Sequence, residues 1–307
     1  MAKQNGEKLT DKGFVAGGTA YTLAAVFSIT LSFLYSIIIT VASKSSGVSV
    51  NEITAKNGVI ILSFFIGSLS VILAVLAVAL KAKLSVKSLI PERAEDKFVY
   101  IPLALITFGF MFGLAEANNL FVSLLEKLGL NYPSVTLPEK SPLNVILTIF
   151  FVCVIPPLAE ETLFRGVILN SLKGFNAFAS AAISAAAFSL FHMSPAQTVY
   201  QFIVGFLYAL IARKSKSTLP TIISHVINNL YIVLNYYFWG FAPTGGVKIA
   251  LTAAGAVALI AGVLTLTLFR KKECAKDESL LKCSKLSVKN MILGFIICGV
   301  MWIVGLF

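Results

Sequence analysis

Acid–base side chains lie in apolar parts of this sequence, where polar groups are energetically unfavourable. The chain has only two histidines, His192 and His225, and both lie in apolar stretches. Asn229 follows His225 by four residues, and the adjacent carboxylates Glu160 and Glu161 lie in another apolar stretch. A charge at the centre of a bilayer costs about 2.5–3.5 kcal/mol on insertion scales, so such groups need a structural or chemical reason.

The two adjacent carboxylates should have different surroundings. Glu161 precedes Arg165 by four residues, a spacing that places both on one helix face and allows an ion pair. Glu160 is turned about 100° away around the same helix. A buried carboxylate without a charged partner can accept or donate a proton. The competing interpretation is a structural charge cluster that holds helices together.

This set of groups permits peptide hydrolysis. Glu160 could take a proton from water while a neighbouring imidazole orients that water. A second imidazole and the amide N–H of Asn229 could donate to a developing oxyanion. Neither a serine nor a cysteine is obviously placed as a nucleophile, since Cys153 lies two turns before Glu160 in an apolar stretch. Direct attack by water is therefore the simpler mechanism, and polar contacts between helices remain the structural alternative.

A zinc site on the same residues is the main chemical rival. Two histidines and Glu160 would supply three ligands, the usual number in a catalytic zinc site. The sequence has no H-E-x-x-H pattern, and His192 and His225 are 33 residues apart. If Glu160 bound zinc, another base would be needed, and Glu161 is expected to pair with Arg165. We therefore favour a site without metal or cofactor, with zinc on the His/Glu cluster as the runner-up.

The elements that carry these groups are expected to be transmembrane helices. Hydrophobic residues make up 57% of the chain and charged residues 13%, which excludes a disordered chain, a nucleic-acid-binding domain and an ordinary soluble enzyme. The composition predicts an all-α polytopic membrane helix bundle of about eight or nine transmembrane helices. Nine apolar runs carry this prediction: 14–43, 57–80, 98–125, 143–172, 177–193, 197–212, 219–241, 247–269 and 290–307.

The net charge of +11 gives an orientation. If the N-terminus is cytoplasmic and the chain crosses at each run, 19 of the 25 basic residues fall inside and five outside, with Arg165 within a run. This bias predicts a cytoplasmic N-terminus. The first run is too long for a signal peptide, so it is expected to stay as an anchor. Lysine bias and the lack of an organelle signal favour a bacterial plasma membrane.

The loops divide the chain into three predicted parts. Residues 1–142 form an N-terminal three-helix membrane region, 143–241 a catalytic core, and 242–307 a C-terminal two-helix membrane region with a basic cytoplasmic loop at 270–289. Cys274 and Cys283 fall on that loop, where they should be reduced, and their spacing matches no zinc pattern. The unusual polar residues collect in the middle part.

Three motifs in the middle part resemble those of one protease family. They are Glu160-Glu161-Thr162-Leu163-Phe164-Arg165, similar to EExxxR; Phe188-Ser189-Leu190-Phe191-His192, similar to FxxxH; and His225-Val226-Ile227-Asn228-Asn229, similar to HxxxN. In their order and their places in apolar runs, these motifs resemble those of the CAAX prenyl protease and bacteriocin-processing (CPBP, Abi) family of intramembrane glutamate endopeptidases. The resemblance covers about 143–241, near a third of the chain.

The resemblance implies a role for each motif residue. Glu160 with His192 would activate water, His225 with Asn229 would form the oxyanion hole, and Glu161 and Arg165 would support the site. The implied function is endopeptidase cleavage of a membrane-associated or C-terminal (CAAX-like) peptide. The implied partners are a peptide or protein substrate and the lipid bilayer, with no nucleic acid. Eukaryotic members trim prenylated CAAX ends, whereas bacterial members are linked to bacteriocin immunity and peptide maturation, so a prenylated substrate is not implied.

Two other functions remain open from the sequence. The first is a non-proteolytic membrane regulator or bacteriocin-immunity protein that keeps the motifs as structure. The second is a proton-linked transporter that uses the carboxylates and imidazoles as a relay. Glu116, with Asn118 and Asn119 nearby, is the best further hint of transport, although a polar helix interface explains these residues more simply. The sequence shows no paired half-repeats with broken helices, which transporters often have.

Overall fold

The computed structural model describes residues 11–82, 93–130, 136–268 and 278–305, with side chains from residue 16 on, and all regular structure in them is helical. The helices are α1 (Asp11–Ser46), α2 (Val50–Thr54), α3 (Asn57–Ala82), α4 (Tyr100–Gly109), α5 (Ala115–Lys127), α6 (Pro142–Thr148), α7 (Ile155–Glu161), α8 (Leu169–Ser171), α9 (Ala177–Phe191), α10 (Thr198–Ser215), α11 (Leu219–Leu234), α12 (Gly245–Leu268) and α13 (Glu278–Val304). Short π-helical segments join α4 to α5, α6 to α7 and α7 to α8 into longer continuous helices.

Seven helical stretches within the described residues are long and apolar enough to cross a membrane: Ala16–Ser46, Asn57–Ala82, Lys97–Lys127, Pro142–Ser171, Pro195–Ser215, Gly245–Leu268 and Glu278–Val304. The chain is therefore an all-α polytopic membrane protein, as its composition predicts. The predicted runs at 177–193 and 219–241 also form helices, α9 and α11, but these are not among the seven. The expected total of eight or nine crossings stays a prediction.

The last helix begins earlier than the sequence predicts. The loop expected at 270–289 is wrong for residues 278–289, because α13 already begins at Glu278. This part of α13 has lysines on its exposed side and buried Ser284 and Ser287 on the side that packs into the protein. An apolar-run search averages over both faces and therefore misses an amphipathic helix. Residue Cys274 lies outside the described residues, and Cys283 lies in α13 rather than in a loop.

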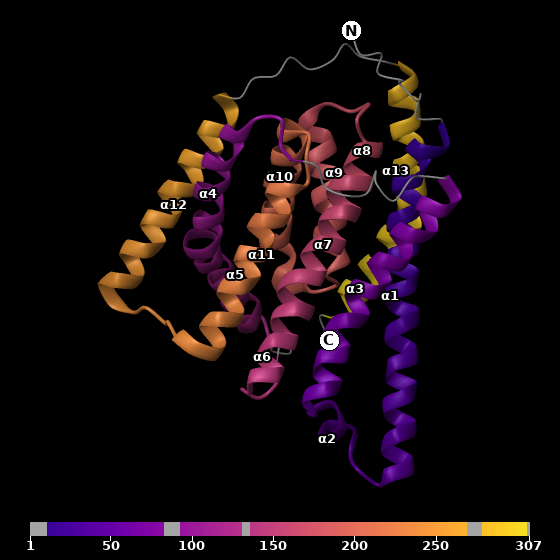
Figure 1. Cartoon of the computed structure of the whole chain (residues 1–307), viewed down its shortest axis with the longest axis vertical. Helices are drawn as coiled ribbons and strands as arrows, with labels where there is room; N and C mark the ends of the chain where they lie inside the picture. The colour runs from indigo at the N-terminus through magenta and orange to yellow at the C-terminus, as the bar shows by residue number, and fades with distance from the viewer. Residues whose placement is uncertain (1–10, 83–92, 131–135, 269–277, 306–307) are drawn as a thin grey trace.

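The helices are arranged as a central group with a flanking group on each side (Figure 1). The central group holds α7, α9, α10 and α11. On one side α1 packs against both α3 and α13, and on the other side α12 packs against α4. The flanking helices thus pair N-terminal with C-terminal parts of the chain. The division into three sequence regions stays a prediction, but the contacts between helices run across it.

Small residues allow the flanking helices to approach closely. A Cβ atom on Gly113 would lie 2.8 Å from the backbone nitrogen of Ala256, and one on Gly255 would overlap the backbone of Gly113. On the other side, the backbone N–H of Gly18 in α1 donates to Ser287 Oγ in α13 at 2.9 Å. Helices in membranes associate through such small-residue contacts and interhelical hydrogen bonds, since apolar burial alone drives little association there.

Candidate active site

A buried ion pair lies at the centre of the polar cluster. Arg165 Nη1 is 3.0 Å from Glu161 Oε1, and both side chains are 0% exposed. The pair joins residues four apart on one helix, as their spacing predicts. The guanidinium carbon of Arg165 lies 4.3 Å from the centre of the Phe188 ring and 5.5 Å from that of Tyr208. Arg165 Nη2 also donates to the carbonyl of Gly205 at 3.4 Å, so the charge is held by aromatic faces and by backbone.

His225 lies between the two neighbouring carboxylates. Its Nδ1 is 3.1 Å from Glu161 Oε1, and its Nε2 is 3.9 Å from Glu160 Oε2. A carboxylate can only accept a hydrogen bond, so the Nδ1 of His225 carries the proton directed at Glu161. The second distance is too long for a direct hydrogen bond. Glu161 therefore fixes the orientation of this imidazole, and its other nitrogen faces Glu160.

Glu160 differs from Glu161 in both exposure and partners. The Glu160 side chain is 17% exposed, whereas that of Glu161 is fully buried. Glu161 contacts both Arg165 and His225 at hydrogen-bond distance. Glu160, turned away around the helix, keeps an accessible carboxylate next to the imidazole of His225. The arrangement leaves Glu160 the freer of the two carboxylates to exchange a proton with water.

His192 joins the cluster through Phe188. The residue lies at the C-terminal end of α9, and its Nδ1 is 2.8 Å from the Phe188 carbonyl oxygen. A carbonyl only accepts, so Nδ1 is the donor, and in a neutral ring Nε2 is left with a free lone pair. The ring centre of Phe188 is 4.8 Å from that of His192 and 6.2 Å from that of His225. Phe188 thus packs against both imidazoles, and the guanidinium of Arg165 lies over its ring.

Asn229 binds a carbonyl that two prolines leave without a helical donor. In a regular α-turn the Val152 carbonyl would accept from residue 156, and in a π-turn from residue 157. Both positions are prolines, which have no N–H. The Nδ2 of Asn229 donates to the Val152 carbonyl at 3.0 Å instead. One amide hydrogen of Asn229 is therefore committed to backbone, and its second hydrogen remains for another acceptor.

The structure therefore brings the predicted site residues together to different degrees. Glu160, Glu161, Arg165 and His225 form one contiguous group of ionisable side chains. His192 is linked to this group by Phe188, and Asn229 lies one turn after His225 with its amide on Val152. The catalytic roles assigned to these residues stay predictions.

Several residues of the cluster were not predicted from the sequence. Tyr208 packs 6.1 Å from His225, and its hydroxyl lies 2.7 Å from Ser224 Oγ. The Ser224 hydroxyl in turn lies 2.5 Å from Thr107 Oγ1. All three residues carry a hydroxyl group inside an apolar run, and this pattern is the sequence signal that could have predicted them. Gly205 leaves room for Phe188, because a Cβ atom there would lie 3.0 Å from Phe188 Cδ1.

The described residues hold no ready-made cluster of metal ligands. In the described parts of the chain, no group of three or more His, Cys, Asp and Glu side chains is placed to hold a metal ion. The Nδ1 of His225 is directed at Glu161, which is paired with Arg165, so the zinc alternative would have to use the Nε2 of His225, on the side of Glu160.

The polar residues near Glu116 belong to a helix interface. Glu116 Oε1 is 2.6 Å from Lys248 Nζ, which links α5 to α12, and Asn119 Nδ2 donates to Glu116 Oε2 at 3.3 Å. Glu116 therefore already has a cationic partner on a neighbouring helix. This contact favours the interface interpretation over a proton relay.

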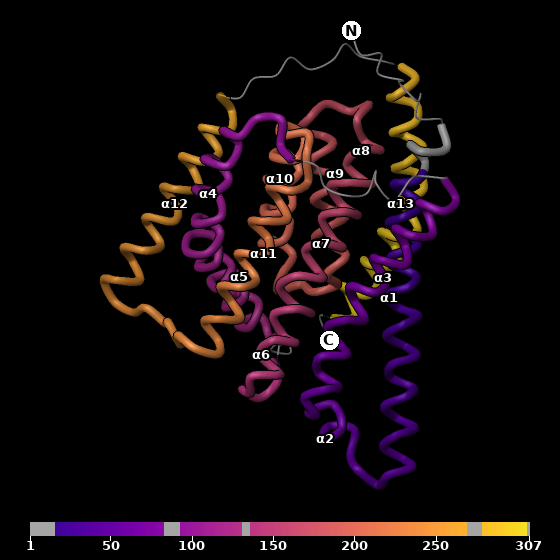
Figure 2. The backbone as a smooth tube through the Cα atoms, in the orientation of Figure 1, coloured from indigo at the N-terminus to yellow at the C-terminus, as the bar shows by residue number. Residues whose placement is uncertain are grey.

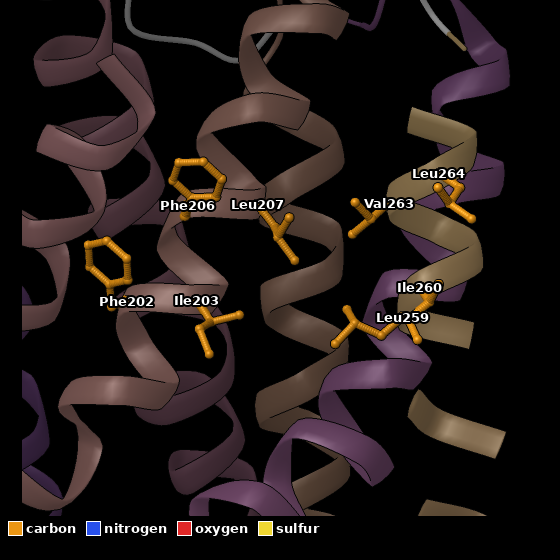
Figure 3. A pocket seen from close by; sticks show the side chains of 8 residues that line it. All are labelled: Phe202, Ile203, Phe206, Leu207, Leu259, Ile260, Val263 and Leu264. Atoms are coloured by element: carbon orange, nitrogen blue, oxygen red, sulfur yellow. The ribbon is translucent and has the colours of Figure 1, made fainter. Parts of the chain in front are cut away.

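An apolar pocket lies between α10 and α12 (Figure 3). Its volume is about 400 Å³, and its lining residues are Phe202, Ile203, Phe206, Leu207, Leu259, Ile260, Val263 and Leu264. The lining carries no acid–base group. Gly205 and Tyr208, which contact Arg165, lie on the same helix but belong to the polar cluster. The pocket and the candidate site are therefore separate features of α10.

Comparison with protein families supports the resemblance drawn from the motifs. Residues 142–231 match the family model described as Type II CAAX prenyl endopeptidase Rce1-like. No curated protein and no solved structure matches the chain. The matched segment includes all six predicted site residues, so the resemblance drawn from the three motifs is confirmed. At the level of the family, the match indicates a membrane-embedded protease.

Proposed function

Starting from the Rce1-like match of residues 142–231, we propose that this protein is an intramembrane endopeptidase in which Glu160 and His192 activate water. The observation that carries the proposal is the contrast between two adjacent carboxylates. Glu161 is fully buried and paired with Arg165, whereas Glu160 is 17% exposed beside His225. An accessible carboxylate next to imidazoles is what a general base needs.

The proposed reaction gives each group a role. Glu160 takes a proton from water as the water oxygen attacks the scissile carbonyl carbon, and the lone pair on His192 Nε2 orients that water. The developing oxyanion is stabilised by the second amide hydrogen of Asn229 and by His225, whose Nε2 must then carry a proton in addition to the one that Nδ1 directs at Glu161. Collapse of the intermediate breaks the C–N bond, and the proton held by Glu160 passes to the departing amine. Glu161 and Arg165 hold His225 in place throughout.

The proposed substrate is a membrane-associated or C-terminal CAAX-like peptide. Such a peptide fits a site carried by membrane helices and the family to which residues 142–231 are matched. For localisation we propose a bacterial plasma membrane with the N-terminus in the cytoplasm, on the charge distribution of the sequence. No cofactor is needed for the steps proposed.

The direct test uses the purified full chain in detergent with two fluorescence-quenched peptides. Both end in Cys-aliphatic-aliphatic-X, one with a farnesylated cysteine and one without. We expect Glu160→Gln and His192→Ala to lower kcat by about 10²–10⁴-fold, the usual contribution of general acid–base catalysis. Glu126→Gln, a change at an exposed glutamate of α5, is the matched control and should cleave at the wild-type rate.

Two outcomes would contradict this function. One is equal cleavage by wild type, Glu160→Gln and His192→Ala. The other is activity that disappears with a chelator and returns with zinc, which would support the metal mechanism instead.

A structural role of the motifs is the second candidate function, and one observation favours it. Glu161 contacts both Arg165 and His225 in the buried interior, as expected of a non-proteolytic regulator or immunity protein that keeps these residues for stability. In that case Glu160→Gln should leave the cellular phenotype intact at normal protein level. Loss of the phenotype at normal expression would exclude it.

A further inference from the structure

His225 lies in α11, which is hydrogen-bonded to α4, and His192 begins the turn into α10, which is hydrogen-bonded to α13. We propose that Thr107 in α4 and Trp302 in α13 are positioning residues, which fix His225 and His192 through Ser224 and Thr198 respectively. The inference rests on the proposed endopeptidase function. It assigns a role to flanking helices whose sequences carry no recognisable motif.

The first tether is a chain of three buried hydroxyl groups from three helices. Thr107 Oγ1 donates to the Leu103 carbonyl in its own helix at 2.7 Å. Because that hydrogen is used, the 2.5 Å contact with Ser224 Oγ requires Ser224 to donate. Ser224 can then accept from the Tyr208 hydroxyl at 2.7 Å. The hydrogen bonds therefore run in one direction, from α10 through α11 to α4.

This row of hydrogen bonds fixes the rotation of α11 next to the site. Ser224 directly precedes His225, so its bond to Thr107 defines which way the following side chain points. Tyr208 is held by the same chain, and its ring packs against His225 and Arg165. A buried hydrogen bond is directional, whereas apolar helix contacts tolerate small rotations.

The second tether closes the turn that follows His192. Trp302 Nε1 donates to Thr198 Oγ1 at 2.6 Å, and the Thr198 hydroxyl donates to the Ser194 carbonyl at 2.9 Å. Ser189 Oγ donates to the Thr198 carbonyl at 2.7 Å. These bonds brace both sides of the turn 192–197, where α9 reverses into α10 (Figure 2).

The backbone of this turn needs such support. Met193, the residue after His192, has φ of +49°, a left-handed conformation that residues other than glycine adopt at a cost. The end of α13 lies against the turn, since a Cβ atom on Gly305 would be 3.3 Å from the Met193 carbonyl oxygen. Trp302 therefore links α13 to the segment that orients His192.

The test measures cleavage of the quenched peptides by variants of the purified full chain, each of which lacks one hydroxyl or one N–H group. We expect Thr107→Val and Trp302→Phe each to lower kcat by about 10-fold or more, because a displacement of about 1 Å can cost about 10²-fold in rate. KM should stay within about twofold, since neither residue contacts the substrate. Thr107→Ser, which keeps the hydroxyl, should restore kcat.

Two control variants match the chemistry of the changes. Thr265→Val removes a hydroxyl that bonds to Ala261 in its own helix at 2.7 Å, as Thr107 does to Leu103. Trp239→Phe changes the other tryptophan of the chain, which is exposed and packs near Tyr231. Both controls should keep wild-type kcat.

The outcomes separate this inference from the proposed function. If wild type cleaves no faster than Glu160→Gln, the endopeptidase proposal fails. If wild type cleaves normally and Thr107→Val and Trp302→Phe match it, only the positioning role is overturned. A fall in kcat that Thr107→Ser does not reverse would also overturn the hydroxyl tether. If Thr107→Val does not fold, Tyr208→Phe, which removes the first hydroxyl of the chain, faces the same criterion.

Discussion

Two adjacent glutamates show how one residue step around a helix changes chemistry. Glu161 is enclosed with Arg165 and His225, whereas Glu160 keeps contact with solvent. The former arrangement suits a group that holds structure, and the latter suits a group that exchanges protons. A variant at each position should therefore separate stability from activity.

Removal of the Arg165 charge should destabilise the protein. Arg165→Met leaves Glu161 buried without its cation, and breaking one partner of a buried pair costs about 3–5 kcal/mol. We expect a clear fall in Tm by scanning fluorimetry in detergent. Glu160→Gln should leave Tm near the wild-type value while it lowers kcat by about 10²–10⁴-fold. Equal Tm for Arg165→Met and wild type would show that the pair contributes little to stability.

Residue spacing predicts some site contacts and not others. The Glu161–Arg165 pair follows from helix geometry, because both residues lie in one helix four positions apart. The contact between His225 and Glu161 joins residues 64 apart, and that between Thr107 and Ser224 joins residues 117 apart. Such contacts depend on how helices are rotated against each other, which a single sequence does not specify.

At the scale of elements, the fourth apolar run is shaped by its two prolines. Pro156 and Pro157 leave the Val152 carbonyl free, and Asn229 from α11 fills the gap. Asn229, which the sequence predicts as an oxyanion donor, thus also joins two helices. The two roles can be separated by restoring the backbone donor.

We predict that Pro156→Ala compensates for the structural loss in Asn229→Ala. Asn229→Ala alone should destabilise by about 1–3 kcal/mol, the cost of an unsatisfied buried acceptor. In the double variant, the new N–H at position 156 can bind the Val152 carbonyl, so Tm should recover in part. Activity should not recover if Asn229 also stabilises the oxyanion. Strictly additive losses of Tm would contradict the assignment of this hydrogen bond.

Element boundaries show where hydropathy alone fails. The run at 57–80 agrees closely with α3 (Asn57–Ala82), because this helix is apolar on every side. Helix α13 begins twelve residues before its predicted run, because its first turns carry lysines on one face and buried serines on the other. The hydrophobic pattern at the start of α13 is periodic rather than continuous, and tertiary packing determines which face is buried.

At the scale of the whole molecule, the flanking helices depend on close backbone approach. Gly113 and Gly255 bring the helix that joins α4 to α5 into contact with α12. The three motifs say nothing about this contact, since both glycines lie outside residues 142–231.

We predict that Gly255→Ala destabilises the protein although alanine favours helices. Its Cβ would overlap the backbone of Gly113, and overpacking costs about 1–3 kcal/mol. Gly246→Ala, in the same helix with nothing within 4 Å, is the control and should be neutral or stabilising. Tm in detergent measures both. A Gly255→Ala variant as stable as Gly246→Ala would show that α12 can shift without loss.

The short helix α9 has a consequence for the lipid around the protein. Its 15 residues span about 22 Å, less than the hydrocarbon core of about 30 Å. If α9 begins at one membrane surface, the turn at 192–197 lies within the depth of the bilayer, where irregular backbone is tolerated only if protein or water surrounds it. A thinner bilayer would bring the headgroups closer to this turn. Lipid chain length thus becomes a physical variable of the site, setting how far water and a peptide end must travel to reach His192.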